Sequence, residues 1–208
     1  MKLLNEDGFI EAGWMVNPNL YKDSEAHFYA RFGSITAGGC FNLLCPGFVQ
    51  VSKDVPLGVI PDKYSKIGQD NQYTSIITIH KHEDGHWWLS IDSDNKLVGY
   101  WPNTLFVRSL KNWASQIEWG GEINNPESGH TPEPYMGSGL SARDDTKLSA
   151  FYCQIKAARS QTQYDNDPKP TEKYQECDDD GYQTYDVGYQ GDVWGRLTFF
   201  GGPFATMT

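Results

Sequence analysis

The sequence lacks long apolar runs and is poor in basic residues. No stretch approaches the roughly 18 consecutive apolar residues of a membrane-spanning helix, and the opening MKLLNEDGF is too polar for a secretory leader, whose apolar region has about 7 to 15 residues. Lys and Arg number 17 against 27 Asp and Glu, so the formal net charge is −10. Such a surface repels a phosphate backbone and is not attracted to an anionic membrane. We therefore expect neither nucleic acid nor a membrane as a partner.

Cysteine is also scarce, and its spacing does not suit a metal. Neither Cys40 with Cys45 nor Cys153 with Cys177 has the CxxC spacing of a zinc knuckle or a thioredoxin-like site. Four cysteines are an even number, which in an extracellular chain suggests two disulfides. The spacing alone leaves all three ways of pairing them possible. Disulfides are therefore favoured over a metal centre.

Internal repeats, low-complexity tracts and Pro/Ser linkers are absent, and Gly and Pro recur along the whole chain. A length of 208 residues is enough for one sizeable core. Twenty-one Gly and eleven Pro accompany seven Trp, twelve Tyr and ten Phe. This mixture favours short strands joined by tight turns. We predict a single all-β domain over residues 1–208.

The clearest strand signal is a hairpin, YTSIITIHKHEDGHWWLSID, in which two β-rich runs flank the turn Glu83-Asp84-Gly85. The run LVGYW follows it and predicts the third strand of a meander. Further strands are predicted for the segments FIEAGWMV, HFYARFG, GFVQV, ASQIEWGGEI, LSAFYCQIK and VWGRLTFFG. So many strands with so little helix predict an antiparallel β-sandwich of two stacked sheets, with a barrel as the alternative.

Two segments depart from this strand pattern. The segment from Asn103 to Leu110 follows Pro102 and has apolar residues at helical spacing, which predicts one short helix. The segment from Ser160 to Gly181 is polar, contains two prolines and ends in an acidic run. That composition predicts a long solvated loop.

Two predicted strands carry a Glu beside Trp and Gly in an otherwise apolar setting. They are FIEAGWMV, with Glu11, and IEWGGEI, with Glu118 and Glu122. A carboxylate among aromatic side chains is poorly solvated, so one member of a pair can stay protonated, as general acid and base catalysis requires. Alternation along a strand puts Glu118 and Glu122 on one face. The alternative is that each Glu points to solvent, since Glu is seldom fully buried.

Two other motifs suggest chemistry only weakly. His80, His82 and His86 lie close together in HKHEDGH, and the first two share a face of the predicted strand, as two metal ligands could. An exposed hairpin is the simpler interpretation, so we expect no metal. Ser138 in MGSGLS lacks the GxSxG setting of a nucleophile elbow, and a Gly-rich turn is the better interpretation.

Several long motifs occur in a fixed order along the chain. They are EAGWMVNPNLYKD, GCFNLLCPGFVQV, WWLSIDSDNKLVGYWPNTLF, EWGGEI, MGSG and VWGRLTFFGGP. Their order is that of the EAGW, CYNLLCPGFVQ, WWL…VGYWP…LF, WGGE, MGSG and WG…FGGPG motifs of the neprosin domain. The match is collinear and spans nearly the whole chain. The sequence thus resembles a family of glutamic peptidases that cut after proline in an acidic medium.

The resemblance implies a catalytic pair, Glu11 from the EAGW segment and Glu122 from WGGE. In such a pair one ionised Glu takes a proton from water, while the other, protonated, polarises the scissile carbonyl and donates to the leaving nitrogen. Two close carboxylates titrate together, which implies a bell-shaped dependence of activity on pH with an acidic optimum. Glu118 precedes the motif, so we expect it to be a supporting or surface residue.

The resemblance also implies substrate contacts and one disulfide. Aromatic rings in a cleft would pack against a proline ring, although aromatic residues also fill sandwich cores. The candidate substrate-binding residues are Trp14, Tyr21, Tyr100 and Trp119. Cys40 and Cys45 match the short disulfide loop of the family. Cys153 and Cys177 do not match the plant-type pattern, so their pairing stays open.

The chain differs from the family pattern at its ends. Ten residues precede Glu11, where the family carries extra strands, and the chain ends GGPFATMT where the plant-type sequence continues as GGPG and a final Cys. We therefore expect a domain that lacks N-terminal strands, and such a loss would disturb the geometry of the catalytic pair. Two alternatives follow: a catalytically silent β-sandwich that binds Pro-rich peptide or polysaccharide, and a glycoside hydrolase with paired carboxylates.

Location and partners follow from the same resemblance. We expect a secreted, extracellular protein whose signal peptide is not part of this sequence. The resemblance implies a Pro-containing peptide or protein as the substrate. It implies no cofactor and no metal, and we expect a monomer.

Overall fold

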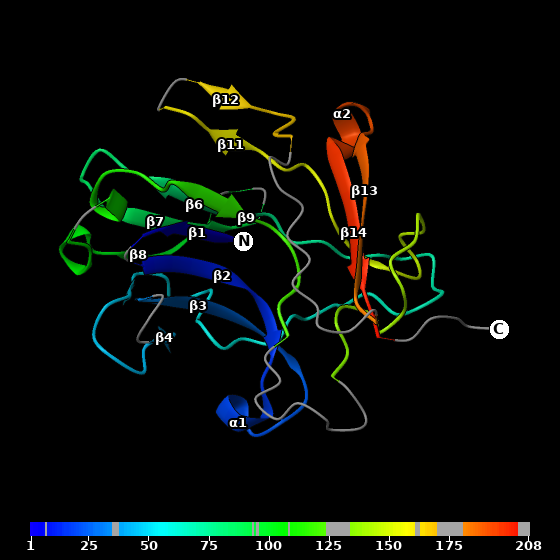
Figure 1. Cartoon of the computed structure of the whole chain (residues 1–208). Coiled ribbons are helices and arrows are strands. Elements are labelled where there is room, and N and C mark those ends of the chain that lie inside the picture. The colour runs from blue at the N-terminus through cyan, green and yellow to red at the C-terminus, as the bar shows by residue number, and fades with distance from the viewer. Residues whose placement is uncertain are drawn as a thin grey trace. The chain divides into compact units, whose positions relative to one another are not determined.

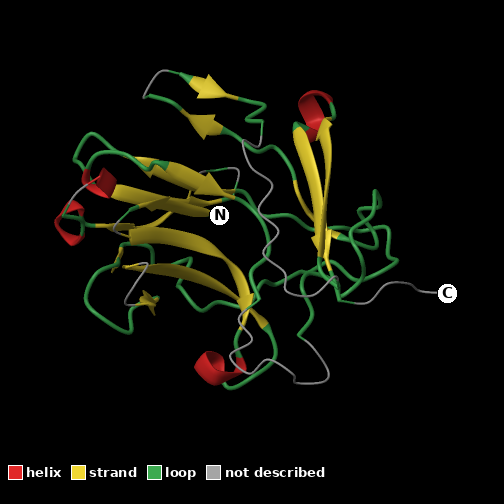
Figure 2. Cartoon of the chain, in the orientation of Figure 1, coloured by secondary structure: helices red, strands yellow, loops and turns green. Residues whose placement is uncertain are grey.

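A computed structural model describes residues 1–6, 8–34, 38–92, 94, 96–107, 109–123, 134–160, 163–169 and 181–203 (Figure 1). The chain divides into two compact units, Met1–Tyr64 with Tyr73–Glu118, and Ser65–Gln72 with Trp119–Thr208. Strands and loops make up nearly all of the described residues (Figure 2). The prediction of an all-β fold is therefore confirmed.

The first unit contains a five-stranded antiparallel sheet of order β4-β3-β2-β1-β9. Its strands are β1 (Lys2–Asn5), β2 (Gly8–Val16), β3 (Ala26–Ser34), β4 (Gly38–Phe41) and β9 (Gln116–Glu118). β2 and β3 are the longest, and they pair from Phe9↔Gly33 to Val16↔Ala26. They correspond to the predicted strands FIEAGWMV and HFYARFG.

A second sheet in the same unit has the order β5-β8-β7-β6. Its strands are β5 (Val49–Gln50), β6 (Ile77–Lys81), β7 (Trp87–Ile91) and β8 (Lys96–Trp101). β6 and β7 form the predicted hairpin, and Gly85 in its turn has a φ of 83°, which glycine adopts without strain. β8 pairs with β7, so the predicted meander of three strands is confirmed.

Side chains from both sheets form one core. Ile10, Ala12, Phe28 and Ala30 of the first sheet are at most 1 % exposed. They belong to one cluster with residues of the second sheet, namely Trp87, Leu89, Ile91, Val98 and Trp101. Burying each large apolar side chain contributes roughly 1.5–3 kcal/mol. The first unit is thus an antiparallel sandwich of two sheets, as predicted.

Helical residues are confined to short turns. The helix predicted after Pro102 is two separate 3-10 turns, η1 (Asn103–Leu105) and η2 (Ser109–Lys111). Phe106, which follows η1, has an extended backbone with φ −110° and ψ 132°, so the first turn does not continue. Within the described ranges, none of the helices has the length and apolar character needed to cross a membrane.

The second unit contains a three-stranded antiparallel sheet of order β10-β14-β13 and a two-stranded sheet, β11-β12. Its strands are β10 (Ala150–Tyr152), β11 (Ala157–Ala158), β12 (Tyr164–Asp165), β13 (Gln183–Tyr189) and β14 (Arg196–Gly201). The single-turn helix α2 (Gly191–Trp194) lies between β13 and β14. Buried apolar side chains of this unit include Leu140, Ile155, Leu197 and Phe199.

An ionic network joins β13 and β14. Arg196 donates to Oδ1 of Asp167 at 2.9 Å and also to Oδ2 of Asp186. The hydroxyl of Thr198 donates to Oδ1 of Asp186 at 3.1 Å. Burial raises the pKa of Asp186, but the hydrogen bonds from Arg196 and the Gly188 amide outweigh it and lower the pKa below its ordinary value. These partners stabilise the charges where they are shielded from water.

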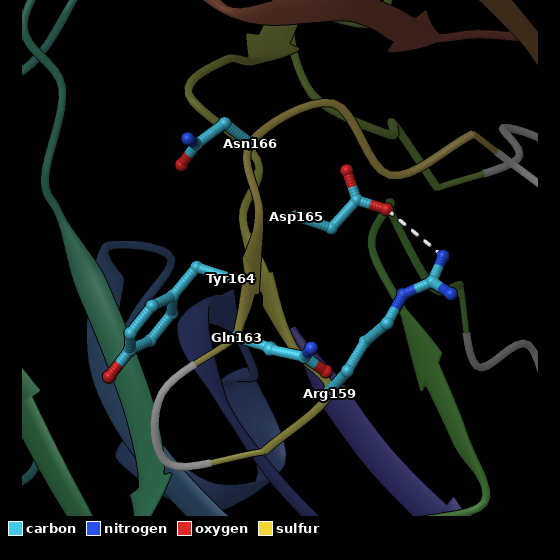
Figure 3. Close-up of a pocket in the computed structure, with 5 residues that line it drawn as sticks. All are labelled: Arg159, Gln163, Tyr164, Asp165 and Asn166. Carbon is cyan, nitrogen blue, oxygen red and sulfur yellow. Dashed lines mark hydrogen bonds and ion pairs between the residues drawn. The ribbon is translucent and has the colours of Figure 1, made fainter.

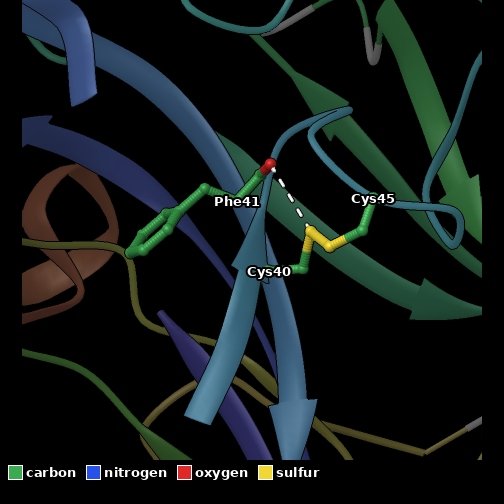
Figure 4. Close-up of a disulfide and its surroundings, with 3 residues drawn as sticks. All are labelled: Cys40, Phe41 and Cys45. Carbon is green, nitrogen blue, oxygen red and sulfur yellow. Dashed lines mark hydrogen bonds between the residues drawn. A yellow bond between two sulfur atoms is a disulfide. The ribbon is translucent and has the colours of Figure 1, made fainter.

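Cys40 of β4 and Cys45 form a disulfide, with their Cα atoms 6.2 Å apart (Figure 4). Sγ of Cys40 lies 3.9 Å from the carbonyl oxygen of Phe41. The disulfide implied by the motif GCFNLLC is therefore confirmed. Cys153 is half-buried, and Cys177 lies outside the described residues.

The loop predicted from Ser160 to Gly181 contains one short strand. β12 pairs with β11 in a two-stranded antiparallel sheet. Residues 161–162 and 170–180 of this segment lie outside the described residues. The prediction of a continuous loop is therefore corrected at β12, where pairing with a neighbouring segment overrides the polar composition.

Candidate active site

Glu11 lies in the middle of β2, on the face of the sheet opposite the core. Ile10 and Ala12 are core residues, so alternation along the strand directs Glu11 to the other face. Its exposed fraction is nevertheless 5 %. A carboxylate with so little contact with water needs partners, because desolvating an unpaired charge costs several kcal/mol.

Residues at the same register on neighbouring strands form a row of alternating charge. Lys2 of β1 and Arg31 of β3 lie directly opposite Glu11. Glu118 of β9 lies opposite Lys2. Directly opposite residues of antiparallel strands point to the same face, and opposite charges at such positions attract. Glu118 precedes the WGGE motif and was not assigned to the catalytic pair. It is nevertheless part of the row of charged residues that contains Glu11.

Two side chains of β3 contact the carboxylate of Glu11. The hydroxyl of Tyr29 donates a hydrogen bond to Oε1. Nη1 of Arg31 lies 3.5 Å from Oε2. Oε2 is buried and has no hydrogen-bond partner among the described residues. The two carboxylate oxygens thus differ, because a neutral donor holds one and a fixed positive charge lies beside the other.

Two aromatic rings hold Arg31 in place. Its guanidinium carbon lies 4.9 Å from the ring centroid of Phe9 and 4.9 Å from that of Phe41. Such cation–π contacts contribute about 0.5–1 kcal/mol each at exposed sites and more when they are desolvated. Nζ of Lys2 lies 5.1 Å from the same Phe9 centroid. The rings of Phe9 and Phe41 restrict the movement of the Arg31 guanidinium. The group is thus pre-organised before any substrate binds.

Glycine residues make room for these large side chains. A Cβ atom on Gly39 of β4 would lie 2.8 Å from the ring of Phe9 and 3.1 Å from Nε of Arg31. A Cβ atom on Gly13 of β2 would lie 3.4 Å from the ring of Tyr29, at the limit of ordinary contact. Gly39 is therefore required for the observed packing of the cluster, and Gly13 is required less strictly.

Sequence reasoning did not single out Tyr29 and Arg31. The segment HFYARFG alternates apolar residues with His27, Tyr29 and Arg31. This period of two predicts a polar face on β3. This pattern does not identify the contacts of Tyr29 and Arg31 with Glu11, because those contacts depend on the register that places Arg31 opposite Glu11.

Glu122 follows β9 in the chain and belongs to the second unit. Its residue is exposed, whereas Trp119 three positions earlier is half-buried. A Cβ atom on Gly121 would lie 2.6 Å from the side chain of Met136, so the segment packs closely against that residue. The pairing of Glu122 with Glu11 stays a prediction.

Trp14 and Tyr21 lie in different surroundings. Trp14 is on the core face of β2, and its ring centroid lies 5.4 Å from that of Phe28. It therefore points away from the face that carries Glu11. Tyr21 stacks on His27, with ring centroids 3.8 Å apart. A role for either residue in substrate binding stays a prediction.

Tyr100 lies on the outer face of the four-stranded sheet, in a group of rings. Its centroid lies 4.8 Å from those of both His86 and Trp88. His80 and His82 are also near one another, with centroids 6.3 Å apart. Burial, followed by the nearby His82, lowers the pKa of His80. Where residues are described, no group of three or more His, Cys, Asp or Glu is arranged to hold a metal ion.

A hollow in the second unit lies at the β11–β12 hairpin (Figure 3). Its lining residues are Arg159, Gln163, Tyr164, Asp165 and Asn166. Nη2 of Arg159 lies 3.3 Å from Oδ2 of Asp165. Apart from Asp165 the lining residues are exposed. The hollow contains none of the predicted catalytic or substrate-binding residues.

The neprosin family model matches residues 2–203 of the chain. The chain belongs to the neprosin family. The matched range begins at β1 and ends beyond β14, so it runs through both units. The resemblance seen in the motifs is therefore confirmed. Membership of this family supports a peptidase-type hydrolase.

Proposed function

We propose that this neprosin-family chain is a glutamic endopeptidase that hydrolyses peptide bonds after proline under acidic conditions, with Glu11 and Glu122 as its catalytic carboxylates. The observation that carries the proposal is the setting of Glu11, a buried carboxylate held by Tyr29 and Arg31 on the face opposite the core. Glu is almost never fully buried unless it is paired, so a Glu that is buried with a specific set of partners is a candidate functional residue. Family membership supports the proposal, and Glu122, the Glu of the WGGE motif, is the proposed second carboxylate.

Two carboxylates are sufficient for the chemistry. An ionised carboxylate takes a proton from water, whose oxygen then attacks the scissile carbonyl carbon. A protonated carboxylic acid polarises the carbonyl oxygen and donates its proton to the leaving nitrogen. No metal or organic cofactor enters this scheme. Because the reaction needs one ionised and one protonated group, activity should have an optimum in the acidic range.

The proposed substrate is a Pro-containing peptide or protein. A proline ring presents an apolar surface and a fixed φ, so little conformational entropy is lost when it is ordered against an aromatic ring. Trp14, Tyr21, Tyr100 and Trp119 stay the proposed aromatic contacts. We also propose that the protein acts outside the cell and as a monomer, and the Cys40–Cys45 disulfide supports the first of these proposals.

The test compares three isosteric variants. Glu11→Gln, Glu122→Gln and Glu118→Gln are incubated at acidic pH with a peptide that contains a single proline, and mass spectrometry identifies the bond that is cut. We expect the wild type and Glu118→Gln to cleave after proline and the other two variants to lose activity by at least about 10³-fold while staying folded. Glu118→Gln is a matched control, because it also removes a charge from the row beside Lys2.

Three results would overturn the proposal. Full activity in Glu11→Gln or Glu122→Gln would exclude the catalytic pair. A folded wild type that cleaves neither the peptide nor a glucan in parallel, yet binds one of them, would favour a non-catalytic binding module. Cleavage of the glucan alone would assign the carboxylates to glycoside hydrolysis.

A further inference from the structure

We propose that Glu11 takes the proton of the attacking water through Oε2, and that Tyr29 and Arg31 are positioning residues that hold Glu11 for this step. The inference rests on the proposed function, because it assigns roles within that reaction. It starts from the difference between the two carboxylate oxygens of Glu11. Oε1 accepts the hydrogen bond of Tyr29, whereas Oε2 has no hydrogen-bond partner among the described residues.

Tyr29 fixes the orientation of the carboxylate. Its hydroxyl donates to Oε1, so turning the carboxylate out of plane would break a buried hydrogen bond. The position of Oε2 is then fixed as well. A buried oxygen left without a hydrogen bond destabilises a fold by about 1–3 kcal/mol, and such an atom calls for a functional explanation. Accepting a proton from a reacting water is that function here.

Arg31 stabilises the same oxygen without competing for the proton. Its guanidinium lies 3.5 Å from Oε2 through Nη1. A guanidinium has no acceptor and stays protonated in proteins, so a proton that reaches Oε2 cannot pass to Arg31. Phe9 and Phe41 hold the guanidinium from two sides. Arg31 therefore orients Glu11 and does not relay protons.

The proton balance of the reaction follows from these roles. Water gives one proton to Oε2 of Glu11 while its oxygen bonds to the carbonyl carbon. Glu122, initially protonated, hydrogen-bonds the carbonyl oxygen and then gives its proton to the nitrogen as the C–N bond breaks. After the products leave, Glu11 releases its proton to solvent and Glu122 takes up a proton from solvent, which restores both carboxylates. One water is consumed, and no oxidant or reductant is needed.

The first test removes one oxygen atom. Tyr29→Phe keeps the ring and its packing but takes away the hydrogen bond to Oε1. We expect kcat for a Pro-containing peptide to fall by about 10²-fold, because a small misplacement of a reacting group has an effect of that size. KM should change by less than about two-fold, since the substrate contacts remain. Tyr73→Phe, an exposed tyrosine of the same unit, is the matched control and should keep the wild-type kcat.

The second test uses chemical rescue. Arg31→Ala leaves a space between Phe9 and Phe41 that matches a guanidinium ion. We expect its kcat to fall by at least about 10²-fold and to recover several-fold when guanidinium chloride is added well below denaturing concentrations, but not when ammonium chloride is added. Arg159→Ala removes a guanidinium from an exposed ion pair with Asp165 and should respond to neither salt.

The outcomes separate this inference from the proposed function. A wild type without peptidase activity would overturn both the proposed function and this inference. A wild type that cleaves, a Glu11→Gln variant that does not, and a Tyr29→Phe variant with unchanged kcat would overturn the positioning roles alone. If Arg31→Ala does not fold, as near-ultraviolet circular dichroism would reveal, Tyr29→Phe decides the question by itself.

Discussion

Arg31 of β3 lies directly opposite Glu11 of β2, and its Nη1 is 3.5 Å from Oε2 of the carboxylate. The two side chains are 21 % and 7 % exposed, respectively. Shielded charges attract more strongly than surface charges, but each is also costly to leave unpaired. The stability of the fold should therefore depend on both residues together.

A double-mutant cycle measures this dependence. Arg31→Met keeps an apolar stem between the aromatic rings but leaves the Glu11 charge without its cation. We expect the free energy of unfolding to fall by about 2–4 kcal/mol, slightly less than for a fully buried pair. In the Glu11→Gln background the same change should cost about 1–2 kcal/mol less, because a neutral amide needs no cation. Urea unfolding of the four proteins gives these values, and equal losses in both backgrounds would exclude the coupling.

The sheet around Glu11 could be predicted only in part. β2 and β3 are long and alternate clearly, so their sequences predicted both strands. β1 has four residues and β4 begins with two glycines, so neither has a strong strand signal of its own. These two strands form because they pair with β2 and β3. Short strands of this kind, whether at the edge of the sheet like β4 or inside it like β1, depend on their neighbours, which a pattern within one segment does not reveal.

The candidate site, like the sheet, could be predicted from the sequence only in part. Alternation in FIEAGWMV predicts that Glu11 and the core residue Ile10 face opposite ways. It does not reveal that Glu11 is buried, because the burial arises from side chains such as Tyr29 that come from another strand. The Cys40–Cys45 disulfide was predicted from the resemblance of GCFNLLC to the family's short disulfide loop, since the spacing of the four cysteines alone left all three pairings possible. Features confined to one segment were therefore predictable, whereas features that depend on strand register were not.

His27 of β3 is buried, and both of its ring nitrogens face acceptors. Nδ1 lies 2.7 Å from the carbonyl oxygen of Gly58, and Nε2 lies 2.9 Å from Oδ1 of Asp23. Only the doubly protonated ring donates to both. The hydrogen bond to Gly58, followed by that to Asp23, raises the pKa of His27, and the charge of Glu25 acts in the same direction. Tyr21 stacks on the ring.

This arrangement should make stability fall as the pH rises above neutrality. A folded-state pKa above the unfolded value of about 6.5 means that folding favours proton uptake. The stabilisation is complete below the unfolded pKa and is lost as the pH rises through the folded one. The pKa of Asp23 is lowered, chiefly by its hydrogen bond with His27, so its own contribution is lost only at acidic pH.

Urea unfolding at several pH values tests the role of His27. Between about pH 6 and pH 8, where histidine titrates, we expect the midpoint of the wild type to fall and that of His27→Gln to change much less. Parallel slopes for the wild type and His27→Gln would show that His27 is not the responsible group.

The Cys40–Cys45 disulfide closes a loop with a sequence separation of five residues. A short loop loses little entropy on closure, so the chain-entropy model predicts a contribution of about 2 kcal/mol. The double variant Cys40→Ser/Cys45→Ser should lose this amount in urea unfolding. A reducing agent should remove about this amount more stability from the wild type than from the double variant, which keeps only Cys153 and Cys177. A double variant as stable as the oxidised wild type would contradict the prediction.

Gly39 and Gly13 provide a matched pair for testing how tightly the Glu11 cluster is packed. A methyl group on Gly39 would meet the Phe9 ring and the carbonyl oxygen of Phe32 at 2.8 Å each, and it would also crowd Arg31. Because a backbone oxygen cannot move aside cheaply, Gly39→Ala should lower the free energy of unfolding by about 1–3 kcal/mol. Gly13→Ala, whose methyl group stays 3.4 Å from the nearest ring atom, should lower it by less than about 1 kcal/mol.

The two variants also separate crowding from the general effect of replacing glycine in a strand. Alanine at either position reduces the conformational freedom of the unfolded chain by a similar amount. A larger loss in Gly39→Ala therefore reports contact with Phe9 and Arg31. If both variants are equally stable, the aromatic rings shift without an energetic cost. Phe9 and Phe41 would then hold Arg31 less tightly than the two 4.9 Å contacts indicate.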